Sequence, residues 1–103
     1  MTRGDVWWVE DPAAGRRPHL VLTRDTAVPV LNLLICVPAT RTVRGIATEV
    51  RLTTNDGMPE DCVLSLDNVT LVPKEFLVER ITALRGHRMH EVCEALAIAT
   101  GCD

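Results

Sequence analysis

The segment Leu31-Asn32-Leu33-Leu34-Ile35-Cys36-Val37 lies between Pro29 and Pro38 and decides how this chain folds. It is short and almost entirely apolar, and the proline at each end favours a buried β-strand over a helix. The chain continues as Val37-Pro38-Ala39-Thr40, which closes the run with a hydroxyl group. The sequence therefore predicts a buried strand over 31–37 with Thr40 at its polar end.

A second segment, Gly15-Arg16-Arg17-Pro18, runs directly into the apolar stretch His19-Leu20-Val21-Leu22. Pro18 begins the predicted strand over 18–23, and a residue that precedes proline is held in an extended conformation, which aims the Arg17 guanidinium outward. If this strand and the strand that ends at Thr40 are neighbours, an arginine and a threonine hydroxyl converge at one edge of a small sheet. Such a pair of donors suits a phosphate group.

The rest of the chain is predicted to form mostly short strands. Strands are expected over 5–10, 48–52, 62–66 and 69–72, whereas 11–15, 40–47 and 55–59 read as loops or turns. From Gly86 onward, apolar residues recur at steps of three and four until Gly101, which is typical of an amphipathic helix. The predicted fold class is a β-rich α+β domain, a small barrel or sandwich with a C-terminal helix.

Length and composition limit the class of protein. A chain of 103 residues forms one domain, 1–103, and 47% hydrophobic residues support a small core that self-association would stabilise further. A dimer is therefore expected. No window approaches the roughly 18 apolar residues of a membrane span, and the chain does not open with a signal segment. We expect a soluble, cytoplasmic protein.

The four cysteines are spread over the chain without a Cys-x-x-Cys pair, at Cys36, Cys62, Cys93 and Cys102. This spacing argues against a zinc site, and no metal is expected. In a protein without a signal segment, we interpret the cysteines as small buried hydrophobic residues plus one terminal thiol.

The positive charges are concentrated in the first half of the chain. Residues 1–55 contain seven arginines and five acidic residues, net +2, whereas residues 56–103 contain four cations and nine acidic residues, net −5. Ten of the eleven cations are arginine. This bias favours bidentate recognition of groups such as phosphate, although GC-rich coding produces the same bias.

Several short motifs follow one another in a characteristic order. They are Arg3-Gly4-Asp5-Val6-Trp7, Arg17-Pro18, Val37-Pro38-Ala39-Thr40, Arg44-Gly45, Thr48-Glu49-Val50, Asp67-Asn68-Val69 and, in the predicted helix, Glu94-Ala95-Leu96. In this order and spacing, the chain resembles the MazF/PemK family of toxin endoribonucleases over nearly its whole length. The resemblance implies an SH3-like barrel and a homodimer whose two subunits form a groove for single-stranded RNA. It also implies a cognate antitoxin whose disordered tail blocks that groove.

The reaction that the resemblance implies is sequence-selective RNA cleavage without a metal or another cofactor. The ribose 2′-hydroxyl attacks the adjacent phosphate and leaves a 2′,3′-cyclic phosphate and a 5′-hydroxyl. The resemblance places Arg17 and Thr40 at the catalytic centre, where Arg17 stabilises charge and Thr40 donates to a phosphate oxygen or orients the attacking hydroxyl. The alternatives are a surface ion pair of Arg17 with Glu10 or Asp11, and a Thr40 hydroxyl that bonds its own backbone.

Four further residues are expected to bind RNA. Arg16, Arg41 and Arg44 are expected to follow the phosphate backbone, and Arg44 matches the family's cation before glycine. Asn68 stands where the family usually has glutamine in an Asp-Gln-Val motif. For the arginines, the alternative is a solvated basic loop.

The aromatic and imidazole side chains offer weaker evidence. Trp7 and Trp8 alternate faces, so we expect one in the core and the other outside, at a subunit interface or against a base. The chain has three histidines that could act as general acid and base, at positions His19, His87 and His90. We expect none of them to be essential, and His19 is the first candidate for mutagenesis.

The chain departs from the family pattern in two places. The loop 11–16 is shorter than the family's and lacks its acidic residue, and Thr70 stands where many members have arginine or lysine. We therefore expect one RNA backbone contact to be missing. The alternative function is a non-catalytic SH3-like binding module or a gyrase-poison toxin of the same fold. The pair of Arg17 and Thr40 favours the nuclease.

Overall fold

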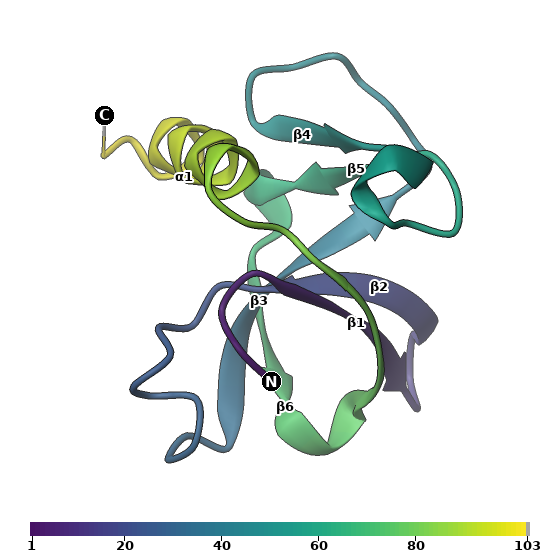
Figure 1. Ribbon diagram of the computed structural model, residues 1–103, viewed down its shortest axis with the longest axis vertical. Coiled ribbons are helices and arrows are strands. Elements are labelled where there is room, and N and C mark those ends of the chain that lie inside the picture. The colour runs from purple at the N-terminus through teal and green to yellow at the C-terminus, as the bar shows by residue number, and fades with distance from the viewer. Residues whose placement is uncertain (103) are drawn as a thin grey trace.

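A computed structural model describes residues 1–102, which form seven strands followed by one α-helix (Figure 1). The strands are β1 (Asp5–Asp11), β2 (Gly15–Val21), β3 (Leu33–Thr40), β4 (Glu49–Leu52), β5 (Cys62–Ser65), β6 (Thr70–Pro73) and β7 (Leu77–Ala83). Short 3₁₀ turns η1 (Thr54–Asp56), η2 (Leu66–Asn68) and η3 (Lys74–Phe76) connect some of them, and α1 (His87–Thr100) follows β7. The predicted β-rich α+β class with a C-terminal helix is confirmed.

The long strand β3 joins the two halves of the molecule. The strands pair antiparallel in the order β4-β5-β3-β2-β1-β7, and β6 pairs with the first half of β3. The second half of β3 pairs with β5 instead. In Figure 1, β4, β5 and α1 lie in the upper half and β1, β2 and β6 in the lower half, so the sheet curves strongly around β3. This is the small barrel-like arrangement that was predicted.

The core is divided between the two faces of β2 and β3. Successive residues of a strand point to opposite faces, so Leu20 enters one hydrophobic cluster and Val21 enters the other. The first cluster includes Val92 and Ala95 of α1, and the second includes Val72 of β6. Packing on both faces fixes the position of β2 and β3, the strands that carry Arg17 and Thr40.

The strand predicted over 31–37 is shifted and is not buried along its whole length. It begins at Leu33 because the backbone N–H groups of Val30 and Leu31 donate to the Ala27 carbonyl in a turn. Leu33 and Ile35 are 45% and 42% exposed, so the first half of β3 buries one face only. The burial predicted from the continuous apolar run is therefore wrong for Leu33 and Ile35.

Two strands differ from the sequence analysis more substantially. β7 was not predicted, because Glu79 and Arg80 interrupt its apolar pattern; it pairs with β1 through two irregularities in register. β2 begins at Gly15 rather than Pro18, so Arg16 and Arg17 already belong to the strand, where Arg17 pairs with Val9. The helix was predicted correctly, and it ends at Gly101 in the left-handed conformation that glycine favours.

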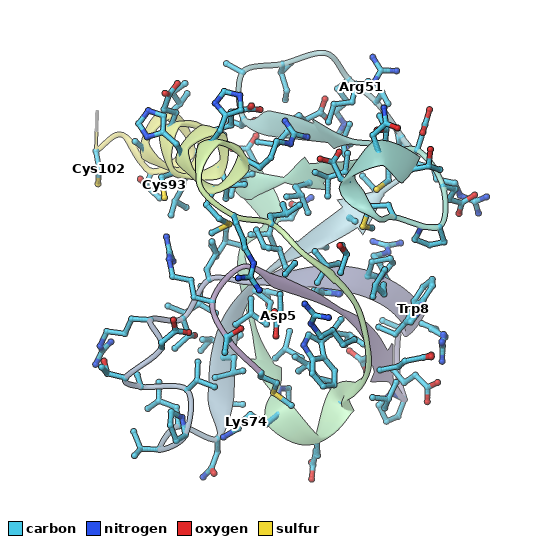
Figure 2. All side chains as sticks on the ribbon, viewed as in Figure 1. Asp5, Trp8, Arg51, Lys74, Cys93 and Cys102 are labelled. Atoms are coloured by element: carbon cyan, nitrogen blue, oxygen red, sulfur yellow. The ribbon has the colours of Figure 1, made fainter. Side chains whose placement is uncertain are left out.

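All four cysteines are free thiols, two buried and two exposed. Burial raises the pKa of Cys36 to about 12 and raises that of Cys62 as well. The expectation of one exposed terminal thiol is wrong for Cys93, which lies with Cys102 on the outer part of α1 and its end (Figure 2). Among residues 1–102, no group of His, Cys, Asp and Glu is arranged to hold a metal ion, and no helix is long and apolar enough to cross a membrane.

Candidate active site

The register of β2 and β3 brings Arg17 and Thr40 together. The β2–β3 ladder ends at the pair His19–Pro38, and Arg17 and Thr40 each lie two residues beyond that pair on their own strand. Beyond His19 the strands separate, because β2 continues along β1 whereas Thr40 pairs with Val63 of β5. A cavity of about 450 Å³ opens where they diverge, and both Arg17 and Thr40 line it. The convergence expected from the sequence is found in the structure.

Thr40 presents a hydroxyl whose hydrogen remains available. The backbone N–H of Thr42 donates to Thr40 Oγ1 over 3.2 Å, so the oxygen acts as the acceptor in this bond. The alternative interpretation, in which the Thr40 hydroxyl bonds the nearby backbone, is therefore correct for its oxygen. Because a hydroxyl can accept and donate at once, Thr40 keeps a donor for a group in the cavity.

The Arg17 guanidinium is exposed and makes no ion pair within residues 1–102. The alternative partner Glu10 binds Arg16 instead, with 2.6 Å between Arg16 Nη1 and Glu10 Oε1. Alternation along β2 explains the difference, since Arg16 and Arg17 leave the strand on opposite faces. Arg17 is therefore a cation at the cavity wall whose charge is not matched by a carboxylate in the described chain.

Arg16 lines the same cavity but is held in place by three contacts. Its second contact is to Glu79 at 3.4 Å, and its guanidinium lies 4.6 Å from the centre of the Trp8 ring. Trp8 also lines the cavity and lies at the edge of the lower half of the molecule in Figure 2, whereas Trp7 packs against the second core cluster. Both indoles are half-buried, so the expectation of one in the core and the other outside is not met: Trp7 only borders the core, and Trp8 is not fully exposed.

Glu60 is a residue of this cavity that the sequence analysis missed. It comes from the segment between β4 and β5 and contacts Arg41 at 3.6 Å, with both side chains largely exposed. Arg41, one of the residues expected to bind RNA, also lines the cavity. Among residues 1–102, Glu60 is the only carboxylate that lines the cavity. No motif pointed to Glu60, since its place depends on how a distant loop folds.

Hydrogen bonds hold the segment between β4 and β5 against β7 and α1. Arg88 of α1 contacts both carboxylate oxygens of Asp56, at 3.0 and 3.2 Å, and the Thr82 hydroxyl donates to the Asp56 carbonyl over 2.9 Å. Gly57 has a φ of +91°, and an added Cβ would lie 2.4 Å from Thr82 Oγ1. Only glycine fits this close approach, which sets the wall formed by Met58, Pro59 and Glu60.

Two predicted RNA-binding residues lie outside the cavity. The backbone N–H of Arg44 donates to the Glu49 carboxylate over 3.1 Å, which holds the loop after β3, while the residue itself is exposed. Asn68 in η2 donates to the hydroxyl of Ser65 over 3.0 Å. The structure therefore brings Arg16, Arg17, Thr40 and Arg41 together but not Arg44 and Asn68.

The histidines are divided between two regions. His87 and His90 are exposed at the start of α1, where they contact Glu91 and Glu94. His19 lies two residues after Arg17 on β2, and burial lowers the pKa of His19 below the ordinary value. His19 does not line the cavity that holds Thr40, but it lines a neighbouring one.

Comparison with known protein families identifies one model that spans almost the whole chain. Residues 2–100 match the model of the PemK-like, MazF-like toxin of type II toxin–antitoxin systems. A curated relative from Mycobacterium tuberculosis, the probable endoribonuclease MazF2, is 41% identical over 103 residues, which cover 99% of this chain and 100% of the relative. Probable endoribonuclease MazF5 from the same species is 43% identical over 98% of this chain and 94% of its own length.

Solved structures show the same arrangement of strands and helix. Mycobacterium tuberculosis toxin MazF-mt6 superposes with a TM-score of 0.88 at 31% identity, over 96% of this chain and 98% of its own. An endoribonuclease in complex with its cognate antitoxin, from a mycobacterial species, gives a TM-score of 0.90 over 100% of this chain and 97% of its own. At 24% identity, this second likeness concerns the fold alone.

Proposed function

Because the chain belongs to the PemK-like, MazF-like toxins of type II toxin–antitoxin systems, we propose that Arg17 and Thr40 are the residues with which this endoribonuclease cleaves RNA. The observation that carries the proposal is their position on one cavity wall, where strands β2 and β3 diverge. The substrate is single-stranded RNA, and cleavage depends on the bases around the scissile bond.

Arg17 suits the charge that develops during the reaction. When the 2′-oxygen attacks phosphorus, the five-coordinate phosphate gains negative charge, which a nearby guanidinium stabilises. Arg17 is free of carboxylates in the described chain, so it does not have to break an ion pair in order to bind a phosphate. It can also give a proton to the departing 5′-oxygen. Arg16 and Arg41 also line the cavity, and each binds a phosphate only after it leaves its carboxylate partners.

Thr40 and Glu60 supply the remaining polar groups. The Thr40 hydroxyl donates to a non-bridging oxygen while it accepts from the Thr42 N–H. A proton must leave the 2′-hydroxyl, and a protonated arginine is a poor acceptor for it. We assign that task to the Glu60 carboxylate, which becomes free when a phosphate takes its place beside Arg41. The arginines supply the positive charge, so the proposed reaction proceeds without a metal ion.

We also propose a homodimer and a cognate antitoxin as partners. Membership of a toxin–antitoxin family supports an antitoxin whose disordered tail occupies the RNA groove in the cytoplasm. Ile35 and Leu71 face each other across β3 and β6 and are 42% and 58% exposed. A second subunit that covers such a pair gains the free energy of apolar burial. Arg44 and Asn68 are proposed to contact RNA outside the cavity.

The test is cleavage of mixed RNA by the purified protein in EDTA, with the new 5′ ends mapped and their hydroxyl groups identified. Loss of one group that stabilises transition-state charge costs roughly 10²–10³ in rate, so Arg17→Ala and Thr40→Val are each expected to cleave that much more slowly. Arg24→Ala is the matched control, because Arg24 is exposed and lies outside the cavity; it is expected to cleave normally.

Cleavage that requires magnesium would contradict the mechanism, as would unchanged cleavage by both variants. If the protein cleaves no RNA but binds gyrase tightly, the non-nucleolytic alternative replaces the proposal.

A further inference from the structure

A second cavity of about 190 Å³ adjoins the candidate active site, and Arg17 lines both. It lies between the β1–β2 loop on one side and β6 with η3 on the other. An RNA phosphate bound at Arg17 would therefore stand between two hollows. A ribonucleotide chain has a nucleoside on each side of every phosphate, so this geometry suits a chain that places one nucleoside in each cavity.

The walls of the second cavity suit a flat, partly apolar group. Val9, Pro73 and Phe76 provide the apolar surface, and a few polar side chains interrupt it. A mainly apolar hollow with a small number of polar groups is the usual form of a small-molecule site. The volume is below the roughly 300–1,000 Å³ of sites for drug-sized ligands, so it suits one base rather than a whole nucleotide.

Besides Arg17 and the Thr70 hydroxyl, two polar side chains of this cavity, His19 and Asp11, offer hydrogen-bond acceptors. His19 Nδ1 lies 3.2 Å from the carbonyl oxygen of Arg17, and a carbonyl can only accept. Nδ1 therefore carries the hydrogen, which leaves Nε2 of the neutral ring as an acceptor. Burial lowers the pKa of His19, which keeps the ring neutral at pH 7. Asp11 adds a carboxylate, of which one oxygen accepts from the Ala13 N–H over 2.8 Å.

We propose that this second cavity binds the nucleobase adjacent to the scissile phosphate and selects a base with an exocyclic amino group. The amino group donates to His19 Nε2 or to the Asp11 carboxylate, in the way that acidic side chains accept from cytosine N4. The ring packs against Phe76, as unstacked bases of single-stranded RNA pack on aromatic side chains. This inference rests on the proposed function, since it requires the phosphate to sit at Arg17.

The test compares oligonucleotides that differ by a single cytosine or uracil at each position flanking one cleavage site. Cytosine carries an amino group where uracil carries a carbonyl, so the pair isolates the donor. Wild-type protein in EDTA is expected to cleave the cytosine substrate about tenfold faster at one flanking position, which corresponds to roughly 1.4 kcal/mol of discrimination.

Two variants assign that preference to the second cavity. His19→Leu removes the acceptor and is expected to bring the cytosine-to-uracil ratio close to one at that position only. Thr70→Phe fills the cavity from an exposed position on β6, so it is expected to fold and to lose the same preference. His90→Leu is the control, because His90 is exposed on α1 and contacts Glu94; its ratio should match that of the wild type.

A cytosine-to-uracil ratio that stays unchanged in His19→Leu and Thr70→Phe would overturn this inference, and so would a wild-type preference for uracil at both positions. Either result leaves the proposed nuclease activity intact. Absence of cleavage by the wild-type protein would instead overturn the proposed function and, with it, this inference.

Discussion

Replacing Arg88 by methionine removes the side chain that fastens one wall of the candidate active site. Arg88 contacts Asp56 at 3.0 and 3.2 Å, contacts Glu91 at 2.6 Å and also donates to the Arg51 carbonyl. Asp56 in turn accepts from the Thr53 N–H over 2.9 Å and so closes the turn η1. Methionine keeps most of the apolar stem of arginine but none of these donors.

The expected loss of stability follows from the burial of the pair. Hydrogen bonds to charged groups contribute about 1.5–3 kcal/mol each when they are protected from water. The side chains of Arg88 and Asp56 are 28% and 15% exposed, so solvent weakens the interaction, and we expect the whole substitution to cost about 2 kcal/mol. In a domain of this length, that corresponds to a Tm lower by about 8 °C.

Thermal unfolding followed by circular dichroism measures this change at fixed protein concentration. Arg85→Met is the matched control, because Arg85 is exposed and makes no side-chain ion pair in the described part of the chain. Its Tm is expected to change by less than 2 °C. Arg88→Lys should fall between the two, since lysine keeps the charge but not the two-pronged contact with Asp56. If Arg88→Met unfolds at the same temperature as Arg85→Met, the proposed fastening of the loop is wrong.

Two further predictions concern ionisation. Burial alone would raise the pKa of Asp5, but hydrogen bonds from Thr2, Trp7 and Arg80 outweigh it and hold that pKa below the ordinary 3.8. The stabilisation by Asp5 is therefore complete above pH 3.8 and is lost as the pH falls through the pKa of Asp5 in the folded state. Asp5→Asn should therefore flatten the acid side of a plot of unfolding free energy against pH. A plot as steep as that of the wild type would contradict this prediction. The second prediction concerns thiol alkylation at pH 8, followed by mass spectrometry. The exposed Cys93 and Cys102 should react quickly, whereas the buried Cys36 and Cys62 should react only after unfolding. Rapid modification of all four cysteines would contradict the burial.

Most of the fold could be predicted because local signals and tertiary structure agree. Gly15 begins β2, Gly86 and Gly101 flank α1, and the apolar pattern changes from strand to helix at the correct place, whereas Pro29 and Pro38 locate β3 only approximately. β7 could not be predicted in the same way, because three consecutive residues in it, Val78, Glu79 and Arg80, are exposed and two of them are charged. Its conformation depends on pairing with β1, which is a long-range contact that no short window contains.

The residues of the candidate site also differ in whether local sequence signals or long-range contacts place them. Arg17 and Thr40 could be paired from the sequence, because each lies within two residues of a proline in its strand and the two strands are neighbours. Glu60 and the second cavity could not, because contacts between residues far apart in the chain place them. The contact of Arg88 with Asp56 spans 32 residues, and that of Thr82 with Asp56 spans 26. Site residues that two neighbouring strands bring together can be predicted from the sequence, whereas those that a loop, a strand and a helix position jointly cannot.

The measurement that tests the central claim most directly is a double-mutant cycle for RNA cleavage with Arg17→Ala, Thr40→Val and the combined variant. If both side chains act on one phosphate, the loss from Thr40→Val should shrink from roughly 10²–10³ in the wild-type background to a few-fold once Arg17 is absent. If the two losses instead multiply in full, the residues act independently, and the shared phosphate site is contradicted.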